Sequence, residues 1–237
     1  MSTVVDVIAA PKAAFERLRD VPMWGWAFII TIVLALIGTI LEGPATRHAS
    51  VAFLAHMQQT NPIFAGLSDA KKQQMLANAA HPPVWQQAIG WVQIVIVILV
   101  TVLLNSVVLL VGNAAGKGQA DFKRLWCASM NIAVPTLGIG LIVWGAITLA
   151  RGADSFNSIA DVSRAMPSIG TLVPTAQGAL AGFLGAISIF TIWGMFLNAA
   201  ALMIVARVSK GLAYGVAVAI LVLGALLQAG AASLFHY

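Results

Sequence analysis

The residues of this chain with metal-binding chemistry are its histidines, its acidic residues and one cysteine. A zinc site needs ligands at close spacing, such as H-x-x-x-H on one helical face or paired cysteines. Here His48 and His56 are separated by a full eight positions with no ligand midway, and Cys127 has no cysteine partner. His81 and His236 each stand alone in the sequence. We therefore predict no metal site.

Nucleotide binding and covalent catalysis would need motifs that the chain lacks. Its glycine-flanked lysine, Gly116-Lys117-Gly118, does not match G-x-x-x-x-G-K-[ST], the loop that cradles phosphates. The sequence contains neither a G-x-S-x-G nucleophile motif nor H-E-x-x-H. We therefore predict a protein that has no catalytic residue and no cofactor and is not an enzyme.

The most informative polar residues are three asparagines inside long apolar stretches, Asn105, Asn131 and Asn198. At about 1.5 Å of rise per residue, all three would lie roughly 9–12 Å from the same boundary, and Thr31 reaches a similar depth. Amides buried in an apolar medium seek partners, each pair contributing about 0.6–2 kcal/mol. We expect a polar layer joining four helices. It either holds the helices together or forms one end of a substrate or lipid path.

The stretches that carry this layer are long enough to cross a membrane. Of the 237 residues, 60% are hydrophobic and 9% are charged, whereas soluble domains average roughly 45–50% and about 25%. No Asp, Glu, Lys, Arg or His interrupts five apolar runs, and a span needs about 20 such residues. We predict an all-α polytopic membrane protein, a bundle of five transmembrane helices. The predicted spans are 24–41, 88–111, 125–149, 179–206 and 212–235.

The distribution of Lys and Arg predicts the orientation of the bundle. One set of segments outside the spans holds Lys12, Arg17, Arg19, Lys117, Lys123, Arg124, Arg207 and Lys210. The other set holds Arg47, Lys71, Lys72, Arg151 and Arg164. Because basic residues collect on the cytoplasmic side, we predict that the N-terminus is cytosolic and, after five spans, that the C-terminus is outside. Topology thus accounts for the net charge of +5, and we predict no nucleic-acid partner.

Residues 1–23 are predicted to form a cytosolic amphipathic segment with an interfacial helix. Pro11 suits the first turn of that helix. Apolar residues recur at helical spacing on one side of it: Val5, Ile8, Phe15 and Leu18. The segment either caps the bundle in the cytosol or lies on the membrane surface. Its acidic residues exclude a cleavable signal peptide.

Other residues predict how the helices bend and pack. Pro135 should kink the third span, because proline removes a backbone hydrogen bond. Ser68 and Asp69 predict the start of a short helix, and 150–178 is predicted to be an irregular loop. Two G-x-x-x-G motifs would allow close packing, either within the bundle or between copies in a homo-oligomer. They are formed by Gly178 with Gly182 and by Gly211 with Gly215.

Three stretches resemble the Yip1 domain family. They are Pro11-Lys12-Ala13-Ala14-Phe15-Glu16-Arg17-Leu18 with Val21-Pro22, the loop Gly116-Lys117-Gly118 through Phe122-Lys123-Arg124-Leu125 followed by Pro135, and Trp193 with the small residues after it. The resemblance covers most of the chain and implies five spans with a cytosolic N-terminus. Eukaryotic members act in vesicle traffic between endoplasmic reticulum and Golgi and bind Rab-type GTPases, so it also implies a trafficking-like role.

The chain has only about 23 residues before its first span, whereas those eukaryotic members usually carry a longer cytosolic region. GTPase binding is therefore not carried over. The short form is similar to prokaryotic members of the family, which implies a location in the cytoplasmic (inner) membrane.

Two functions fit these features. The first is a non-enzymatic Yip1-type protein that scaffolds unknown protein partners or organises the membrane. It would contact anionic lipids or a partner through four cytosolic residues, Lys117, Phe122, Lys123 and Arg124. The alternative is a small transporter or channel component, against which stands the lack of ionisable residues in the spans. A cavity reaching Asn105 and Asn198 would favour transport, and a closed bundle would favour scaffolding.

Overall fold

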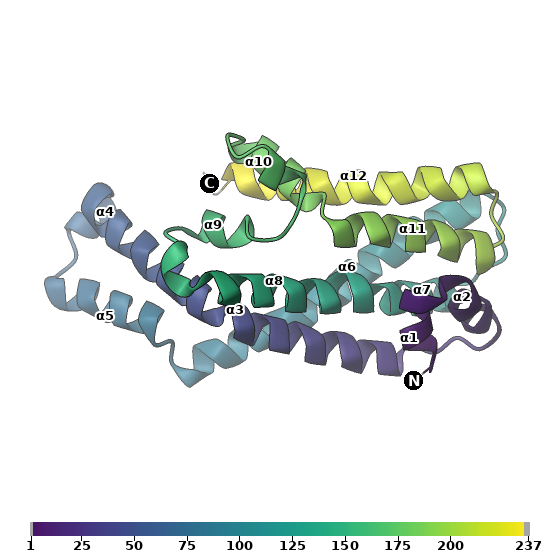
Figure 1. The fold of residues 1–237 in the computed structure, drawn as a ribbon, viewed down its shortest axis with the longest axis horizontal. Coiled ribbons are helices and arrows are strands. Elements are labelled where there is room, and N and C mark those ends of the chain that lie inside the picture. Colours follow the sequence, from purple (N-terminus) through teal and green to yellow (C-terminus); the bar gives the residue numbers. More distant parts are fainter. Residues whose placement is uncertain (1, 235–237) are drawn as a thin grey trace.

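The computed structural model describes residues 2–234, which form a bundle of long helices running side by side (Figure 1). The first six elements along the chain are α1 (Ser2–Ala9), α2 (Pro11–Asp20), α3 (Gly25–Thr60), α4 (Pro62–Ala65), α5 (Asp69–Ala80) and α6 (Val84–Ala115). The rest are α7 (Phe122–Ala133), η1 (Val134–Ile139), α8 (Gly140–Arg151), η2 (Ala153–Ser155), α9 (Ile159–Ser163), η3 (Ile169–Leu172), α10 (Gly178–Ala186), α11 (Ile189–Ile204) and α12 (Lys210–Leu234).

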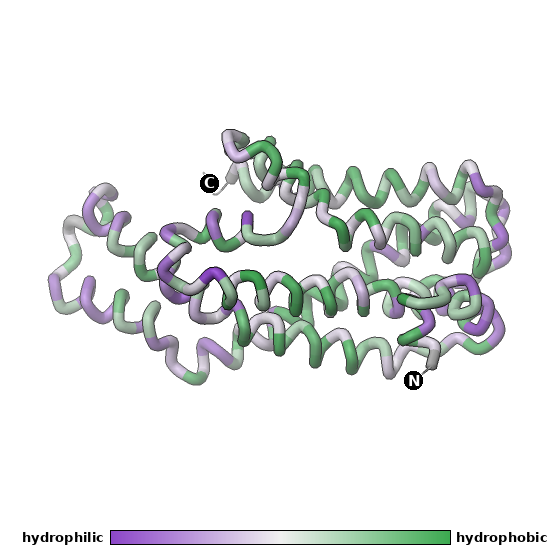
Figure 2. The backbone as a smooth tube through the Cα atoms, viewed as in Figure 1, coloured by the Kyte–Doolittle hydropathy of each residue, from purple (hydrophilic) through white to green (hydrophobic). Residues whose placement is uncertain are grey.

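The bundle is built to lie in a membrane. Within the described residues four helices are long and apolar enough to cross one, namely Gly25–Thr60, Val84–Ala115, Phe122–Arg151 and Lys210–Ser233. A shorter apolar helix, Ile189–Ile204, lies beside them. Apolar residues follow the middle of the long helices and polar residues gather at both ends (Figure 2). This pattern confirms the predicted all-α polytopic membrane fold.

The two ends of the bundle differ in what they carry. The end we call the basic end contains α1, α2, the α6–α7 loop and the α11–α12 connection (Figure 1). The opposite end, which we call the distal end, contains α4, α5 and α9. Helix α12 starts at the basic end and runs to the distal end.

The first long helix continues well past its predicted end. We predicted a span of 24–41, but α3 runs without interruption from Gly25 through Pro44 to Thr60. The hydropathy pattern stops at Glu42, whereas a helix that has left the hydrocarbon no longer needs apolar residues to continue. The extension packs against α5, which begins after Ser68 as predicted, since the Ser68 hydroxyl accepts a hydrogen bond from the Lys71 amide.

The fourth predicted span, 179–206, is instead two helices. It is divided at Ile187 and Ser188 into α10 and α11. Ser188 accepts a hydrogen bond from the Thr191 amide, and the Thr191 hydroxyl accepts one from the Ser188 amide, which together cap the start of α11. The 16 residues of α11 extend only about 24 Å. The run stays apolar across the break, so hydropathy alone does not detect it.

Pro135 lies where the third span changes its geometry. It is the second residue of η1, a six-residue π-helical segment between α7 and α8. Proline cannot donate the backbone hydrogen bond of a regular helix, so a wider turn at this position is physically expected. The predicted kink thus coincides with a π-helical segment.

The N-terminal segment consists of two helices that pack against the basic end. Pro11 is the first residue of α2, as predicted, and α2 packs against α11 and α7. Phe15 and Leu18 are fully buried, but Val5 and Ile8 are 63% and 41% exposed. The predicted apolar side is wrong for α1, where the buried residues include Val4 and Val7. The break before Pro11 rotates α1 relative to α2, so one helical spacing does not extend across both.

The long helices pair in two groups that separate toward the distal end. Helix α3 packs along α8, and both α10 and α11 pack along α12. At the basic end one apolar core joins the groups through residues of α2, α6, α7, α11 and α12. Toward the distal end, within the described residues, α8 makes no comparable contact with α10 or α12.

Only one of the two predicted glycine motifs packs tightly inside the bundle. A Cβ on Gly182 would lie 2.5 Å from the Gln228 carbonyl oxygen of α12, so α10 and α12 approach closely there. Gly178 begins α10 with a φ of 54°. By contrast, Gly211 and Gly215 have no heavy atom of the described chain near a Cβ position.

Candidate functional site

The amides predicted to share one depth include a pair that meets directly. The Asn105 Nδ2 of α6 donates to the Asn198 Oδ1 of α11 at 3.0 Å. The same nitrogen lies 3.0 Å from the Ser129 Oγ of α7 and donates to it. Asn198 and Ser129 are buried, so these bonds join three helices away from water. Ser129 was missed from the sequence because serines are common in apolar helices and bond their own backbone.

The other two residues of the predicted layer make separate bonds. Asn131 Nδ2 donates to the Met23 carbonyl oxygen at 3.0 Å and to that of Cys127 at 2.8 Å. It therefore ties the chain entering α3 to α7. Thr31 Oγ1 donates to the Ala27 carbonyl oxygen of its own helix at 2.7 Å. The structure thus brings Asn105 and Asn198 together but leaves these two outside that network.

The loop after α6 is held by the side chain of Asn113. Asn113 Nδ2 donates to the Ala120 carbonyl oxygen at 2.9 Å, and its Oδ1 accepts from the Ala120 amide at 3.3 Å. The Gly118 amide also donates to the Asn113 carbonyl oxygen. Lys117 at the tip of the loop has a φ of 51°, which is a strained conformation for a lysine. Asn113 was not singled out from the sequence, although its place one turn before Gly116 is a usable signal.

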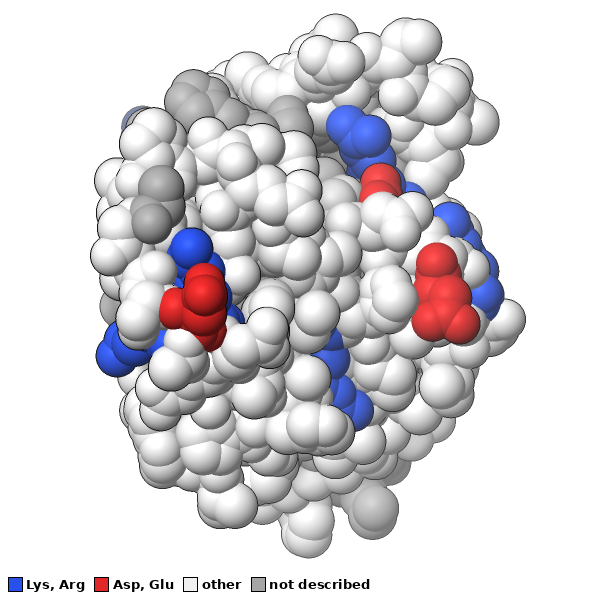
Figure 3. Space-filling model, turned by 90° about the vertical axis from the view of Figure 1, so that its left-hand side faces the viewer, with Lys and Arg blue, Asp and Glu red and all other residues white. Residues whose placement is uncertain are grey.

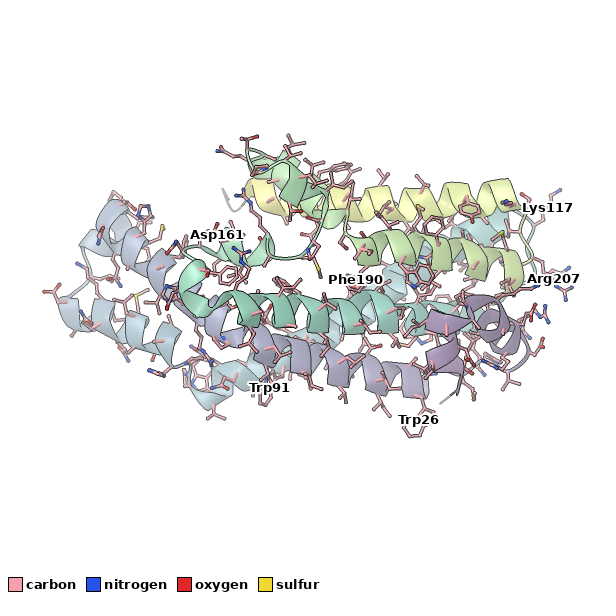
Figure 4. The ribbon with its side chains drawn as sticks, viewed as in Figure 1. Trp26, Trp91, Lys117, Asp161, Phe190 and Arg207 are labelled. Atoms are coloured by element: carbon pink, nitrogen blue, oxygen red, sulfur yellow. The ribbon has the colours of Figure 1, made fainter. Side chains whose placement is uncertain are left out.

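This loop docks on the connection between α11 and α12. The Gln119 amide donates to the Ala206 carbonyl oxygen at 2.9 Å, and Arg207 Nη1 donates to Gln119 Oε1 at 3.2 Å. Gly118 has no room for a side chain, since a Cβ would lie 2.7 Å from the Ala206 carbonyl oxygen. Lys117 and Arg207 therefore lie at the same end of the bundle (Figure 4).

The four residues predicted to contact lipid or a partner differ in their solvent exposure and in the bonds they already make. Arg124 is half-buried, and its Nε donates to the Arg19 carbonyl oxygen at 2.8 Å while its Nη1 bonds Asp121 at 3.1 Å. Its guanidinium therefore connects α2 to α7. Lys117, Lys123 and Phe122 are exposed, and the Phe122 ring lies 6.2 Å from that of Trp126.

The basic end has a large excess of positive charge. Its acidic residues Asp6, Asp20 and Asp121 pair with Arg17, Arg19 and Arg124, and the remaining one is Glu16. The hydrogen bond from Arg19 lowers the pKa of the Asp20 carboxyl, because it stabilises the ionised form. Five exposed cations at this end make no ion pair with any described residue. They are Lys12, Lys117, Lys123, Arg207 and Lys210.

The distal end is close to charge balance. It carries Arg47, Lys71, Lys72, Arg151 and Arg164 together with Glu42, Asp69, Asp154 and Asp161. Figure 3 looks onto this end and shows basic and acidic groups near one another. The charge asymmetry between the two ends therefore follows the pattern on which the orientation was predicted.

A cavity of about 1250 Å³ lies where the two helix groups separate. Residues of α3, α6, α8, α10, α11 and α12 line it, together with parts of the 150–178 segment. Thr136 of η1 and Phe190 of α11 are among its lining residues, whereas Asn105 and Asn198 are not. The polar pair and the cavity are thus separate features.

Metal binding has no support in the described part of the chain. Residues 2–234 contain no group of three or more His, Cys, Asp or Glu side chains that could hold an ion. His236 lies outside the described residues. The absence of a metal site and of catalysis stays a prediction.

Comparison with known proteins agrees with this architecture. The model of the Yip1 domain family matches residues 5–231. A relative from Bacillus subtilis (strain 168), "Membrane protein YknW", is 24% identical over 209 residues, covering 88% of this chain and 80% of the relative. No solved structure matches the chain significantly. Since the family match extends from α1 into α12, across the α6–α7 loop and the apolar helices, this chain belongs to the Yip1 domain family.

Proposed function

We propose that this protein is a non-enzymatic organiser of a prokaryotic inner membrane, with its basic end in the cytosol. There it would bind anionic lipid headgroups and hold protein partners close to the bilayer. The observation that carries the proposal is the set of five unpaired, exposed cations at the basic end.

These cations come from three separate segments that the fold fixes together. Lys12 belongs to α2, Lys117 lies in the α6–α7 loop and Lys123 just after it, and Arg207 and Lys210 lie in the α11–α12 connection and at the start of α12. Asn113 fixes the shape of the α6–α7 loop, and the Gln119 amide holds that loop against the α11–α12 connection. Each basic residue near an anionic surface contributes about 1 kcal/mol of attraction. A rigid array loses little conformational entropy when it binds a charged surface.

The aromatic residues support the same placement of the membrane boundary. Trp26, near the start of α3, is 57% exposed and points outward from the bundle (Figure 4). Trp24 is exposed beside it. Tryptophan collects at the level of lipid headgroups, so these residues favour a boundary just inside the basic end.

The transporter alternative has less support. It requires a path that includes the Asn105–Asn198 pair, whereas the cavity lining contains neither residue. The apolar core at the basic end also lies between the cavity and that end. We therefore favour an organising role over transport.

The lipid part of the proposal is tested in nanodiscs. We expect phosphatidylglycerol, added to a phosphatidylcholine disc, to raise the melting temperature of the protein. Added salt should make that rise smaller, because it screens the attraction between the cations and the lipid. Lys117→Gln with Lys123→Gln should remove much of the rise. The matched control is Lys71→Gln with Lys72→Gln at the distal end, which should retain it. Equal responses from both double variants would refute binding at the basic end.

The orientation is tested separately by thiol labelling in intact cells. Cys127 is buried and is the chain's one cysteine, so Cys127→Ala provides a silent background. In that background Lys71→Cys should react with a membrane-impermeant reagent, and Lys117→Cys should react only after the cells are opened. The reverse pattern would overturn the cytosolic assignment of the basic end.

A further inference from the structure

The position of Glu42 along α3 places part of the cavity wall near the level where lipid headgroups meet water. Glu42 lines it and lies 17 residues after Gly25, the start of α3. At about 1.5 Å per residue this is roughly 25 Å along a helix that crosses about 30 Å of hydrocarbon. Its volume of about 1250 Å³ exceeds the roughly 300–1,000 Å³ typical of sites for drug-sized ligands. A ligand that fills it would be large and would extend from the headgroup level into the apolar layer.

Glu42 brings to the cavity wall a carboxylate that has one unsatisfied oxygen. Its Oε2 atom is buried and has no hydrogen-bond partner among the described residues. No ion pair to Glu42 is formed within the described chain either. A buried carboxylate without a partner is costly, and a cationic N–H donor is the partner that best compensates it.

Two guanidinium groups also line the cavity, one from α3 and one from the end of α9, which packs against α3. Arg47, one turn further along α3, lines the cavity and is not paired with Glu42. Arg164 also lines it, and its Nη2 donates to the Ala176 carbonyl oxygen at 3.1 Å. Guanidinium groups bind phosphate well, and each retains further N–H donors.

Below these charges the cavity wall is apolar. Ile94 and Val97 of α6 line it together with Leu137 and Leu141 of the third span. Phe190, from the first turn of α11, approaches α8, where a Cβ on Gly140 would lie 3.5 Å from its ring (Figure 4). The cavity therefore has a charged upper part and an apolar lower part, which matches the shape of an amphiphile.

We propose that this cavity binds a phospholipid whose headgroup carries a primary amine. The ammonium group pairs with the Glu42 carboxylate, the phosphate faces Arg47 and Arg164, and an acyl chain lies along the apolar wall. Phosphatidylglycerol lacks the cation, and phosphatidylcholine lacks an N–H donor. The site is at the distal end and does not depend on the function proposed for the basic end.

The test uses native mass spectrometry of the full-length, delipidated protein with equimolar phosphatidylethanolamine, phosphatidylglycerol and phosphatidylcholine. We expect one phosphatidylethanolamine adduct to dominate. Glu42→Gln should weaken that adduct roughly tenfold, the value of one charged hydrogen bond, without changing the phosphatidylglycerol adduct. Asp69→Asn, which removes a carboxylate of the same end outside the cavity, should leave all adducts unchanged. Equal adducts for the three lipids, or an unchanged adduct in Glu42→Gln, would overturn the proposal.

A second variant tests the cavity without touching its charges. Gly90 of α6 lines the cavity, and a Cβ there would meet no atom within 4 Å, so Gly90→Leu should fold and occupy part of the space. It should reduce the phosphatidylethanolamine adduct, whereas Gly215→Leu, at an equally open position on α12, should not. Retention of the adduct in Gly90→Leu would place the lipid elsewhere. Glycerophosphoethanolamine, which lacks acyl chains, should not compete with phosphatidylethanolamine for the cavity. Full competition by it would mean that the site recognises the headgroup alone and would contradict the proposed acyl-chain contact.

Discussion

Asn105 of α6 donates a hydrogen bond of 3.0 Å to Asn198 of α11, across 93 positions of sequence. Either substitution by leucine leaves the other amide without this partner in an apolar interior. We expect Asn105→Leu and Asn198→Leu each to lower the free energy of unfolding in detergent by about 1 kcal/mol. The double variant should lose less than the sum of the two single losses, because both partners are then apolar.

A control separates this coupling from the general effect of replacing asparagine. Asn78 on α5 is exposed and makes no side-chain hydrogen bond within the described chain, so Asn78→Leu should leave the stability nearly unchanged. If the losses at Asn105 and Asn198 were strictly additive, the two amides would be independent and the contact between them would have no energetic role.

The close crossing of α3 and α8 depends on glycine. A Cβ on Gly38 of α3 would lie 2.5 Å from the Leu141 carbonyl carbon of α8, and one on Gly145 would lie 2.8 Å from the Leu41 Cβ. We expect Gly38→Ala to destabilise the protein by about 1–3 kcal/mol, as overpacking does. Thermal unfolding in detergent measures the loss.

The same helix supplies the control for this crossing. A Cβ on Gly43 would meet its nearest atom, in Arg47, at an ordinary 3.7 Å, so Gly43→Ala should be neutral or slightly stabilising. A similar loss in both variants would indicate that α3 needs glycine for flexibility rather than for close approach to α8.

The sequence predicts how deep along a helix each residue of this site lies, but not which way the residue faces. Depth follows from counting residues, so Asn105 and Asn198 could be placed at one level from the sequence. Which of four candidate residues meet depends on the rotation of each helix, and packing decides that. Asn131 accordingly bonds Met23, and Thr31 bonds its own helix.

The fold likewise has features that the sequence predicts and features that it does not. Five helical stretches are visible in hydropathy because a bilayer imposes length and apolarity on each. The break at Ser188 is invisible to hydropathy, although the Ser188–Thr191 cap has a local sequence signal. The cavity could not be predicted, because it arises where α8 and α12, which are far apart in the sequence, do not pack along each other.

Arg124 should be more important for holding α2 than for binding lipid. Its guanidinium bonds both the Arg19 carbonyl oxygen and Asp121, a geometry that a lysine ammonium cannot reproduce. We expect Arg124→Lys to increase amide hydrogen exchange in α2 several-fold. The reciprocal variant Lys123→Arg, at the exposed neighbouring position, should not change it. Unchanged exchange in Arg124→Lys would mean that the apolar contacts of Phe15 and Leu18 suffice to hold the helix.

The loop that resembles the family signature should depend on Asn113 and Gly118 for its shape. Asn113→Leu removes the partners of the Ala120 amide and carbonyl, and Gly118→Ala places a Cβ 2.7 Å from the Ala206 carbonyl oxygen. Losing these bonds costs about 1–3 kcal/mol, so we expect exchange of the loop amides to rise roughly tenfold or more.

Exchange should rise in the α11–α12 connection as well, because the Gln119 amide bonds the Ala206 carbonyl oxygen. Gly211→Ala, at the same end with no atom within 4 Å of its Cβ, is the control and should leave both segments protected. If only the loop responded, the two connections would be adjacent but energetically independent. A joint response would establish that the cations of both segments are held as one array, as binding to a flat anionic surface requires.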